Sequence, residues 1–244
     1  MSETILSKAN PHIKELANLR KSDPSLFLVE GYHLVEMAYE ANCLVEVLCL
    51  DDPHLEGVRT ILTNKEIIEK LSVSKSPEPI IGVCRKVDNE AISSEKALLL
   101  DRVQDPGNVG TILRTALAFG FGRVLSIEGS ASFYNSKAIA SSQGAIFKLR
   151  LQEGLREEEA VRWLKKENYF LLGSSLEGGK PFKEIDVPNR VCLVLGNEGQ
   201  GMSETLKREC SALAYIPISG IDSLNVGVAG GILMQYLNSP VENR

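Results

Sequence analysis

Residues 97–237 repeat one pattern, in which a short apolar run leads through a polar, glycine-containing loop into a helical pattern. The apolar runs at 97–101, 123–127 and 191–195 have the length and composition of buried strands. Strands that alternate with helices in this way form a largely parallel sheet covered on both faces. Ligands bind such sheets beyond the carboxyl ends of the strands, so we expect function in the loops there. Further strands are predicted at 169–172 and 214–218, and helices at 110–119, within 135–146, at 156–167 and at 226–237.

The first part of the chain has the pattern of a smaller α/β unit. Its predicted helices are 12–21, directly after Asn10-Pro11, then 32–38 and 65–71, and its predicted strands are 26–29, 44–50 and 80–84. The polar segment 86–96 follows and is the best linker candidate. We therefore expect two domains, residues 1–90 and 97–244.

Composition excludes several classes of protein. The chain has 244 residues, of which 43% are hydrophobic, enough for two modest cores. No apolar run approaches the roughly 18 residues of a membrane span, and residues 1–10 lack a signal-peptide pattern, so a cytoplasmic protein is expected. The five cysteines are scattered and never spaced C-x-x-C, which indicates buried, reduced thiols and no metal site.

Charge is unevenly distributed along the chain. The net charge of −5 speaks against a protein that coats nucleic acid by bulk charge. All of this acidity lies in residues 1–96, with 11 Lys and Arg against 16 Asp and Glu, while residues 97–244 carry 16 of each. The first 21 residues are locally basic and form a candidate RNA-binding patch of Lys8, Lys14, Arg20 and Lys21.

The first informative loop joins the strand at 97–101 to the next helix. Asn108 is predicted to cap this helix, and helical spacing places Arg114 over Gly110, near the free N–H groups of the first turn. That geometry suits an anion or a developing oxyanion. An ordinary turn with a solvated arginine explains the same residues.

The second loop follows the strand at 191–195 and has three glycines in residues 196–201, which indicates close backbone approach. Ser203 is predicted to cap the helix that follows. Glu198 would repel a phosphate, so a ligand with positive charge fits better. A tight turn with an exposed glutamate is the alternative.

The third loop precedes the helix at 226–237, for which Asp222 or Ser223 is the predicted cap. Gly227, Gly230 and Gly231 lie inside this helix, where glycine costs up to about 1 kcal/mol relative to alanine. Close approach of a ligand, another helix or a second subunit would account for them, as would tight packing within the domain.

Histidine chemistry is excluded from the second part of the chain. All three histidines, His12, His33 and His54, precede residue 55. A Ser-His-Asp triad, a histidine general base and an H-E-x-x-H zinc site are therefore not expected beside these loops.

Taken together, the three loops resemble the three ordered motifs of the SpoU (TrmH-type) RNA ribose methyltransferases. The matching residues are Asp101-x-x-x-Asp105-Pro-Gly-Asn-Val-Gly with Arg114, then Leu195-Gly-Asn-Glu-Gly-x-Gly, then Ile216-Pro-Ile with Ser223-Leu-Asn-Val. The first domain resembles, more loosely, the L30e/L7Ae-like RNA-binding domain, including the pattern that ends Pro79-Ile-Ile-Gly82-Val.

The resemblance implies a SPOUT α/β fold whose C-terminal segment forms a deep trefoil knot, with S-adenosylmethionine bound inside the knot of an obligate homodimer. It implies methyl transfer to a ribose 2′-hydroxyl of RNA, ribosomal RNA in particular because of the extra N-terminal domain. Ser136, Ala140 and Gly227 depart from the family pattern, which often has proline, arginine and serine at these positions.

Residue roles follow by position in the motifs. The catalytic residues implied are Arg114, Asn108, Glu198, Ser223 and Asn225, and the cofactor-binding residues implied are Leu195, Gly196, Ile216, Ile218 and Leu224. An arginine is a poor base because its guanidinium keeps its proton in proteins, so we expect Arg114 to hold a phosphate and stabilise the emerging alkoxide.

Three other functions remain to be distinguished. The N-terminal domain supports a non-catalytic RNA-binding or ribosome-assembly factor, but the intact Asn108, Arg114, Glu198 and Asn225 argue against it. A transfer-RNA methyltransferase would use the same motifs on another RNA. A nicotinamide-dependent oxidoreductase is disfavoured because no dinucleotide fingerprint follows any strand.

Overall fold

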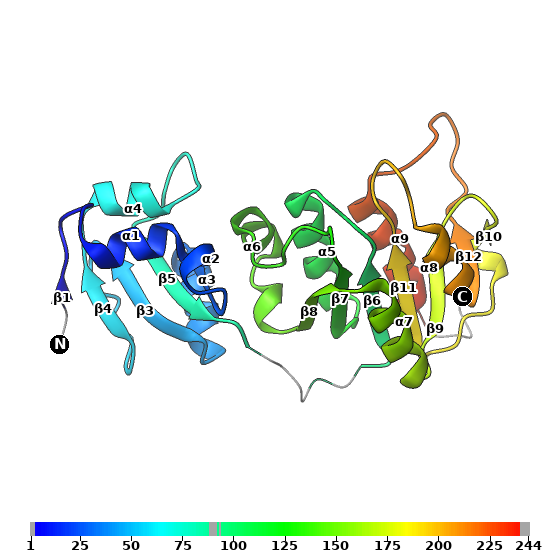
Figure 1. Ribbon diagram of the computed structural model, residues 1–244, viewed down its shortest axis with the longest axis horizontal. Helices are drawn as coiled ribbons and strands as arrows, with labels where there is room; N and C mark the ends of the chain where they lie inside the picture. Colours follow the sequence, from blue (N-terminus) through cyan, green and yellow to red (C-terminus); the bar gives the residue numbers. More distant parts are fainter. Residues whose placement is uncertain (1–2, 88–91, 93, 240–244) are drawn as a thin grey trace. The chain divides into compact units, whose positions relative to one another are not determined.

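The computed structural model describes residues 3–87, 92 and 94–239, without the side chains of Arg20 and Lys21. The chain divides into two compact units, Met1–Asp88 and Asn89–Arg244 (Figure 1). The predicted linker, 86–96, falls partly outside the described residues.

The first unit is built on a mixed five-stranded sheet in the order β1-β4-β3-β5-β2. Its strands are β1 (Glu3–Thr4), β2 (Leu26–Glu30), β3 (Leu44–Cys49), β4 (Arg59–Leu62) and β5 (Ile80–Arg85), and its helices are α1 (Pro11–Ala17), α2 (Leu19–Ser22), α3 (Tyr32–Glu40) and α4 (Lys65–Leu71). Strands β1, β4 and β3 are parallel, while β5 is antiparallel to both of its neighbours. The core on one face joins isoleucines and leucines of α1 and α4 to the sheet. The α/β class is as predicted, but β1, β4 and the break between α1 and α2 were not.

The second unit is a seven-stranded sheet in the order β10-β12-β9-β11-β6-β7-β8, and every strand pair described within this sheet is parallel. The strands are β6 (Lys96–Leu100), β7 (Arg123–Ile127), β8 (Arg150–Leu155), β9 (Phe170–Ser174), β10 (Lys180–Pro181), β11 (Val191–Leu195) and β12 (Ala212–Tyr215). The predicted parallel sheet is confirmed. Strands β6 and β11, almost 100 residues apart in sequence, lie side by side at its centre, so their carboxyl ends meet.

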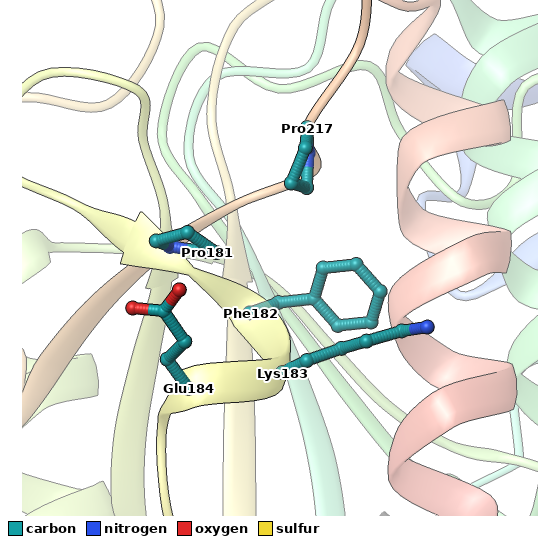
Figure 2. A pocket seen from close by; sticks show the side chains of 5 residues that line it. All are labelled: Pro181, Phe182, Lys183, Glu184 and Pro217. Carbon is teal, nitrogen blue, oxygen red and sulfur yellow. The ribbon is translucent and has the colours of Figure 1, made fainter.

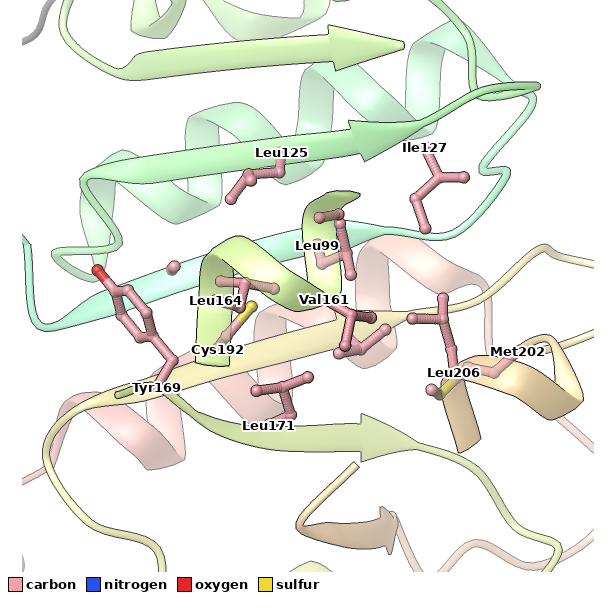
Figure 3. Close-up of a cluster of buried hydrophobic side chains, with 13 residues drawn as sticks. Leu99, Leu125, Ile127, Val161, Leu164, Tyr169, Leu171, Cys192, Met202 and Leu206 are labelled. Atoms are coloured by element: carbon pink, nitrogen blue, oxygen red, sulfur yellow. The ribbon is translucent and has the colours of Figure 1, made fainter. Parts of the chain in front are cut away.

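Helices cover both faces of this sheet. The helical segments are α5 (Pro106–Ala118), α6 (Ser136–Ser142), α7 (Glu157–Lys166), α8 (Glu204–Glu209) and α9 (Val226–Asn238), with short 3-10 turns η1 (Ala145–Phe147) and η2 (Phe182–Glu184). Figure 3 shows the core under α7 and α8, where Leu164, Val161 and Leu206 lie on Leu99 and Cys192. Because side chains alternate along a strand, Leu98, Leu100 and Leu195 face the opposite layer, which contains α5 and α9.

Two predicted helix caps are wrong. Asp105, not Asn108, caps α5, since its Oδ1 accepts the Asn108 N–H at 2.9 Å and Pro106 occupies the first helical position, where proline is favoured. Asn225, not Asp222 or Ser223, caps α9 by accepting from the N–H groups of Gly227 and Val228. The strand predicted at 214–218 is β12, which ends at Tyr215, so Ile216 and Ile218 lie in a loop.

Two helical glycines are required by packing. A Cβ on Gly110 would lie 2.3 Å from the carbonyl oxygen of Ala138 in α6, and a Cβ on Gly230 would lie 2.8 Å from Leu195 Cδ1. A Cβ on Gly231 would make an ordinary contact with Thr115 of α5, and a Cβ on Gly227 would lie 3.5 Å from Thr111 and 3.2 Å from Asn225 Oδ1. Within the second unit, Gly110 therefore allows α5 to approach α6 closely, and Gly230 allows α9 to approach the sheet.

The cysteines are free thiols, as predicted, and all are buried except the half-buried Cys210. Over the described ranges, no helix is long and apolar enough to cross a membrane. The same residues contain no group of three or more potential metal ligands.

Candidate active site

The carboxyl ends of β6 and β11 bring the first two loops together. Leu100 pairs in register with Leu195, and the Asp101 N–H donates to the Leu195 carbonyl at 2.8 Å. The chain therefore leaves both strands at the same edge of the sheet. This edge is the place where parallel α/β sheets bind ligands.

A buried carboxylate joins these two loops. Asp101 is fully buried, and its Oδ1 accepts from Arg102 Nε at 2.7 Å while Oδ2 accepts from the Ser203 N–H at 2.7 Å. Asn197 Nδ2 donates to the Arg102 carbonyl at 2.8 Å. A buried carboxylate needs such partners, and through them Asp101 holds the loop after β6 against the loop after β11. Sequence reasoning assigned it no role, although an aspartate directly after a buried strand was a usable signal.

A chain of hydrogen bonds links all three loops. Asn108 Nδ2 donates to Glu198 Oε1 at 3.1 Å, and Asn108 Oδ1 accepts from Asn225 Nδ2 at 3.0 Å. Asn225 Oδ1 in turn caps α9. Glu198, Asn108 and Asn225 therefore form one connected unit, which we call the Glu198–Asn108–Asn225 chain. Three of the five predicted catalytic residues meet here.

Hydrogen bonds and an ion pair lower the pKa values of two carboxyl groups of this site, Glu198 and Asp105. Burial alone would raise the pKa of Glu198, but hydrogen bonds from the Asn108 side chain and from the backbone N–H groups of Gln104 and Asp105 outweigh it, so the pKa lies below its usual range. The ion pair with Lys137, at 2.8 Å, and the backbone of Asn108 lower the pKa of Asp105. Glu198 is therefore a poor proton acceptor and a good anchor for the loops.

The N–H groups expected near Arg114 belong to an earlier turn of α5 and are already capped. Because α5 begins at Pro106, Arg114 is two turns from the free N–H groups, and Asp105 already accepts from Asn108 and Val109 there. Arg114 follows Asn108 by six residues, roughly 9 Å along the helix and about 240° around it, so it projects from another side. It is exposed and has no hydrogen-bond or ion-pair partner among the described residues.

The loop between β12 and α9 has unused backbone groups. Within the described chain, residues 216–224 make no backbone–backbone hydrogen bond. Leu224 and Ile216 are half-buried, Ile218 is 39% exposed, and Ser223 is exposed. The loop therefore offers apolar side chains together with free N–H and C=O groups, and within the described chain no hydrogen bond joins Ser223 to the Glu198–Asn108–Asn225 chain.

Gly196 is required by the geometry of its own loop. Its Cβ would lie 2.4 Å from Met202 N, because Asn197 and Gly201 exchange two backbone hydrogen bonds that fold the loop back on itself. Leu195 is buried against Gly230, and its carbonyl is used by Asp101. These two residues shape the wall of the site.

A pocket of about 400 Å³ lies beside α9 (Figure 2). It is lined by Pro181, Phe182, Lys183, Glu184 and Pro217. The Phe182 ring meets Tyr236 of α9 edge-on, with centroids 4.8 Å apart. None of the predicted site residues lines the pocket, although Pro217 lies between Ile216 and Ile218.

The predicted basic patch is only partly described. Lys8 Nζ pairs with Glu66 at 3.2 Å, and Lys70 Nζ donates to the Lys8 carbonyl at 2.8 Å. Lys14 lies exposed in the last turn of α1. The side chains of Arg20 and Lys21 lie outside the described residues. The structure adds Lys70 to this patch.

Comparison with known families explains this arrangement. Residues 95–235 match the SpoU rRNA Methylase family, and residues 10–82 match the MRM3-like substrate binding domain. The chain belongs to the SpoU family. The family match covers the elements from β6 to α9 that carry the three loops, and it confirms the resemblance seen in the sequence.

Relatives and solved structures cover both units of this SpoU family member. The chain is 32% identical to the Bacillus subtilis 23S rRNA (guanosine(2553)-2′-O)-methyltransferase RlmP, over 96% of this chain and 98% of that protein. It is also 32% identical to the Coxiella burnetii 23S rRNA (guanosine-2′-O-)-methyltransferase RlmB, over 73% and 76%. An AdoMet-bound rRNA methyltransferase from Sinorhizobium meliloti superposes with a TM-score of 0.88 at 25% identity, over 97% of each chain.

Proposed function

We propose that this protein transfers a methyl group from S-adenosylmethionine to a ribose 2′-hydroxyl in ribosomal RNA. The observation that carries the proposal is the Glu198–Asn108–Asn225 chain, which joins the three family motifs at one edge of the sheet. The relatives named above, which are 2′-O-methyltransferases of 23S rRNA, support the RNA class. A ribosomal substrate implies a cytoplasmic protein, and the resemblance implies a knotted C-terminal segment.

The residues present fit S-adenosylmethionine. When bound, this group supplies a methyl activated by its sulfonium charge. Ile216, Ile218 and Leu224 provide an apolar slot for adenine, and the unpaired backbone of residues 216–224 can meet its polar edge. The ionised Glu198 favours a cation nearby. Gly196 keeps the neighbouring loop closed beside them.

The protein's part in the reaction is alignment and charge stabilisation, since the donor is already activated. Asn108 and Asn225 are held rigidly by Glu198 and by α9, which suits them to orient the ribose. Arg114, exposed and without a described partner, is free to hold a phosphate and stabilise the alkoxide as the 2′-hydroxyl loses its proton. Ser223 lies in the loop of residues 216–224.

Leu224→Asp should weaken S-adenosylmethionine binding at least tenfold, because a charge replaces apolar surface in the slot. Isothermal calorimetry on the folded variant measures this. Val73→Asp, at an exposed apolar position of the first unit, is the control and should bind normally. Unchanged affinity in Leu224→Asp would place the slot elsewhere.

The function itself is tested by mapping ribose methylation in total RNA from cells with and without the gene. The proposal is supported if one ribosomal nucleotide loses its methyl group without the gene. The wild-type gene should restore this methylation, and a gene carrying Arg114→Ala should not. Loss in a transfer RNA instead would favour the transfer-RNA alternative. An unchanged map would favour the non-catalytic factor.

We also propose a homodimer formed through α5 and α9. These helices pack on each other yet leave Leu117, Val228 and Ile232 exposed by 36%, 52% and 37%. Arg114 is three residues from Leu117, on the same side of α5, so a dimer would bring it to the interface. Ile232→Asp should shift the protein from dimer to monomer in size-exclusion chromatography with light scattering. A monomeric wild-type protein would contradict this proposal.

A further inference from the structure

A cluster of arginines lies at the edge of the seven-stranded sheet where its strands begin, opposite the edge that carries the three motif loops. Arg123 opens β7, Arg150 opens β8 in register with it, and Arg190 directly precedes β11. Trp163 and Tyr169 complete what we call the Arg123 cluster. In Figure 3, Tyr169 lies at the end of the core where β6 and β7 start, and Met202 lies at the other end. Strands of five residues separate the two edges by about 16 Å.

Arg123 carries a charge that the described residues do not neutralise. The residue is only 8% exposed, and its Nε is buried without a hydrogen-bond partner. It forms no ion pair with any described residue. Burial, and then the charge of Arg150, lower the pKa of its guanidinium. The guanidinium carbon lies 4.3 Å from the centre of the Trp163 ring, a cation–π contact that offsets part of the cost of burial.

Other charged and polar groups around the cluster interact mainly with one another. Arg190 stacks on Tyr169 at 4.5 Å, donates through Nε to the Glu167 carbonyl at 2.6 Å and lies 3.6 Å from the Glu167 carboxylate. Glu167 is the described carboxylate that acts on Arg123, and it faces Arg190. The Tyr169 hydroxyl donates to the Ser94 carbonyl. The side chain of Arg190 is 38% exposed and Trp163 is half-buried, so the cluster opens to solvent beside them.

A buried guanidinium without an anion is unfavourable, whereas an oxyanion accepts well from several guanidinium groups at once. We propose that the Arg123 cluster binds a backbone phosphate of the RNA substrate, as a contact remote from the site of methyl transfer. This inference rests on the proposed function, because it takes RNA to be the substrate. It assigns the phosphate to Arg123 and Arg190, with Trp163 holding the Arg123 guanidinium in place.

The chain has a built-in reporter for this site, since Trp163 is its one tryptophan. Titration with pyrophosphate, at constant ionic strength set with chloride, should change the fluorescence of Trp163 in a saturable way. Arg190→Gln removes an exposed guanidinium and should weaken this binding at least fivefold. Arg123→Met should abolish it if the variant folds. Arg208→Gln, an exposed arginine on α8, is the matched control and should match wild type.

The second arm measures RNA binding. Arg190→Gln should weaken the affinity for a ribosomal RNA fragment three- to tenfold and reduce the slope of log K against log salt by about 1. The single-turnover rate at saturating RNA should stay unchanged. Absence of a saturable fluorescence change, or equal titrations in Arg190→Gln and Arg208→Gln, would overturn the site. Pyrophosphate binding with unaltered RNA affinity in Arg190→Gln would overturn the RNA contact. Both readouts are independent of methyl transfer, so they fail separately from the proposed enzyme activity.

Discussion

Arg114→Ala should reduce the single-turnover rate of methyl transfer at saturating RNA by about 10²–10³-fold, the usual cost of losing one group that stabilises developing charge. The guanidinium is exposed and has no partner in the described chain, so nothing structural depends on it. The melting temperature should therefore remain close to that of wild type. A large loss of rate with unchanged stability is the signature of a catalytic contact.

Arg114→Lys distinguishes charge from geometry. A lysine keeps the positive charge but loses the planar fork that meets a phosphate through two hydrogen bonds, so an intermediate rate is expected. Arg162→Ala, at an exposed arginine of α7, is the control and should leave the rate unchanged. Full single-turnover rates in both Arg114 variants would show that Arg114 has no role in methyl transfer.

Glu198→Ala should lower kcat by about 10²-fold while destabilising the protein by less than about 1 kcal/mol. The carboxylate accepts from Asn108 Nδ2 and from the N–H groups of Gln104 and Asp105. Its removal releases Asn108, and with it Asn225, from a defined orientation. Water can replace the lost hydrogen bonds because Glu198 is exposed, which keeps the loss of stability small. Single-turnover kinetics and urea unfolding measure the two effects.

Acid should affect the wild-type protein and a Glu198→Gln variant differently. Because the folded-state pKa of Glu198 is lowered, its contribution to stability is present at neutral pH and is lost as pH falls through that lowered value. Urea unfolding across the acid range should show this decline in wild type and less of it in Glu198→Gln.

The kinetic experiment on Glu198→Ala has its own control. Glu204→Gln, which alters an exposed carboxylate of α8, should retain methyl-transfer activity. Equal activity in Glu198→Ala and wild type would contradict an organising role.

Local chemistry made much of the fold predictable. The apolar runs at 97–101 and 191–195 became the adjacent strands β6 and β11, and the alternation of strands and helices correctly indicated a parallel sheet. The ordered motifs indicated the SpoU family, which the family match confirms. These features depend on residues close in sequence, whose periodicity and turn chemistry are readable without a structure.

Prediction from local sequence failed where two neighbouring residues were both suitable helix caps. Asn108 and Ser223 are plausible helix caps by residue type, but Asp105 before Pro106, and Asn225 before the apolar run, hold those positions. The error moved the start of α5 by a full turn, and with it the expected surroundings of Arg114. A capping preference ranks residues, and only the surrounding backbone selects among neighbours.

The sequence alone identified the three ordered motifs of the SpoU family, because the motifs and the absence of histidine beside them are properties of composition and order. The tertiary structure decided how those residues meet. Only the pairing of β6 with β11 and the packing of α9 on α5 place Glu198, Asn108 and Asn225 in one hydrogen-bonded chain, and only the sheet edge buries Arg123 against Trp163. Such contacts join residues 40 to 120 positions apart, and their geometry follows from strand register and helix packing, which no local pattern specifies.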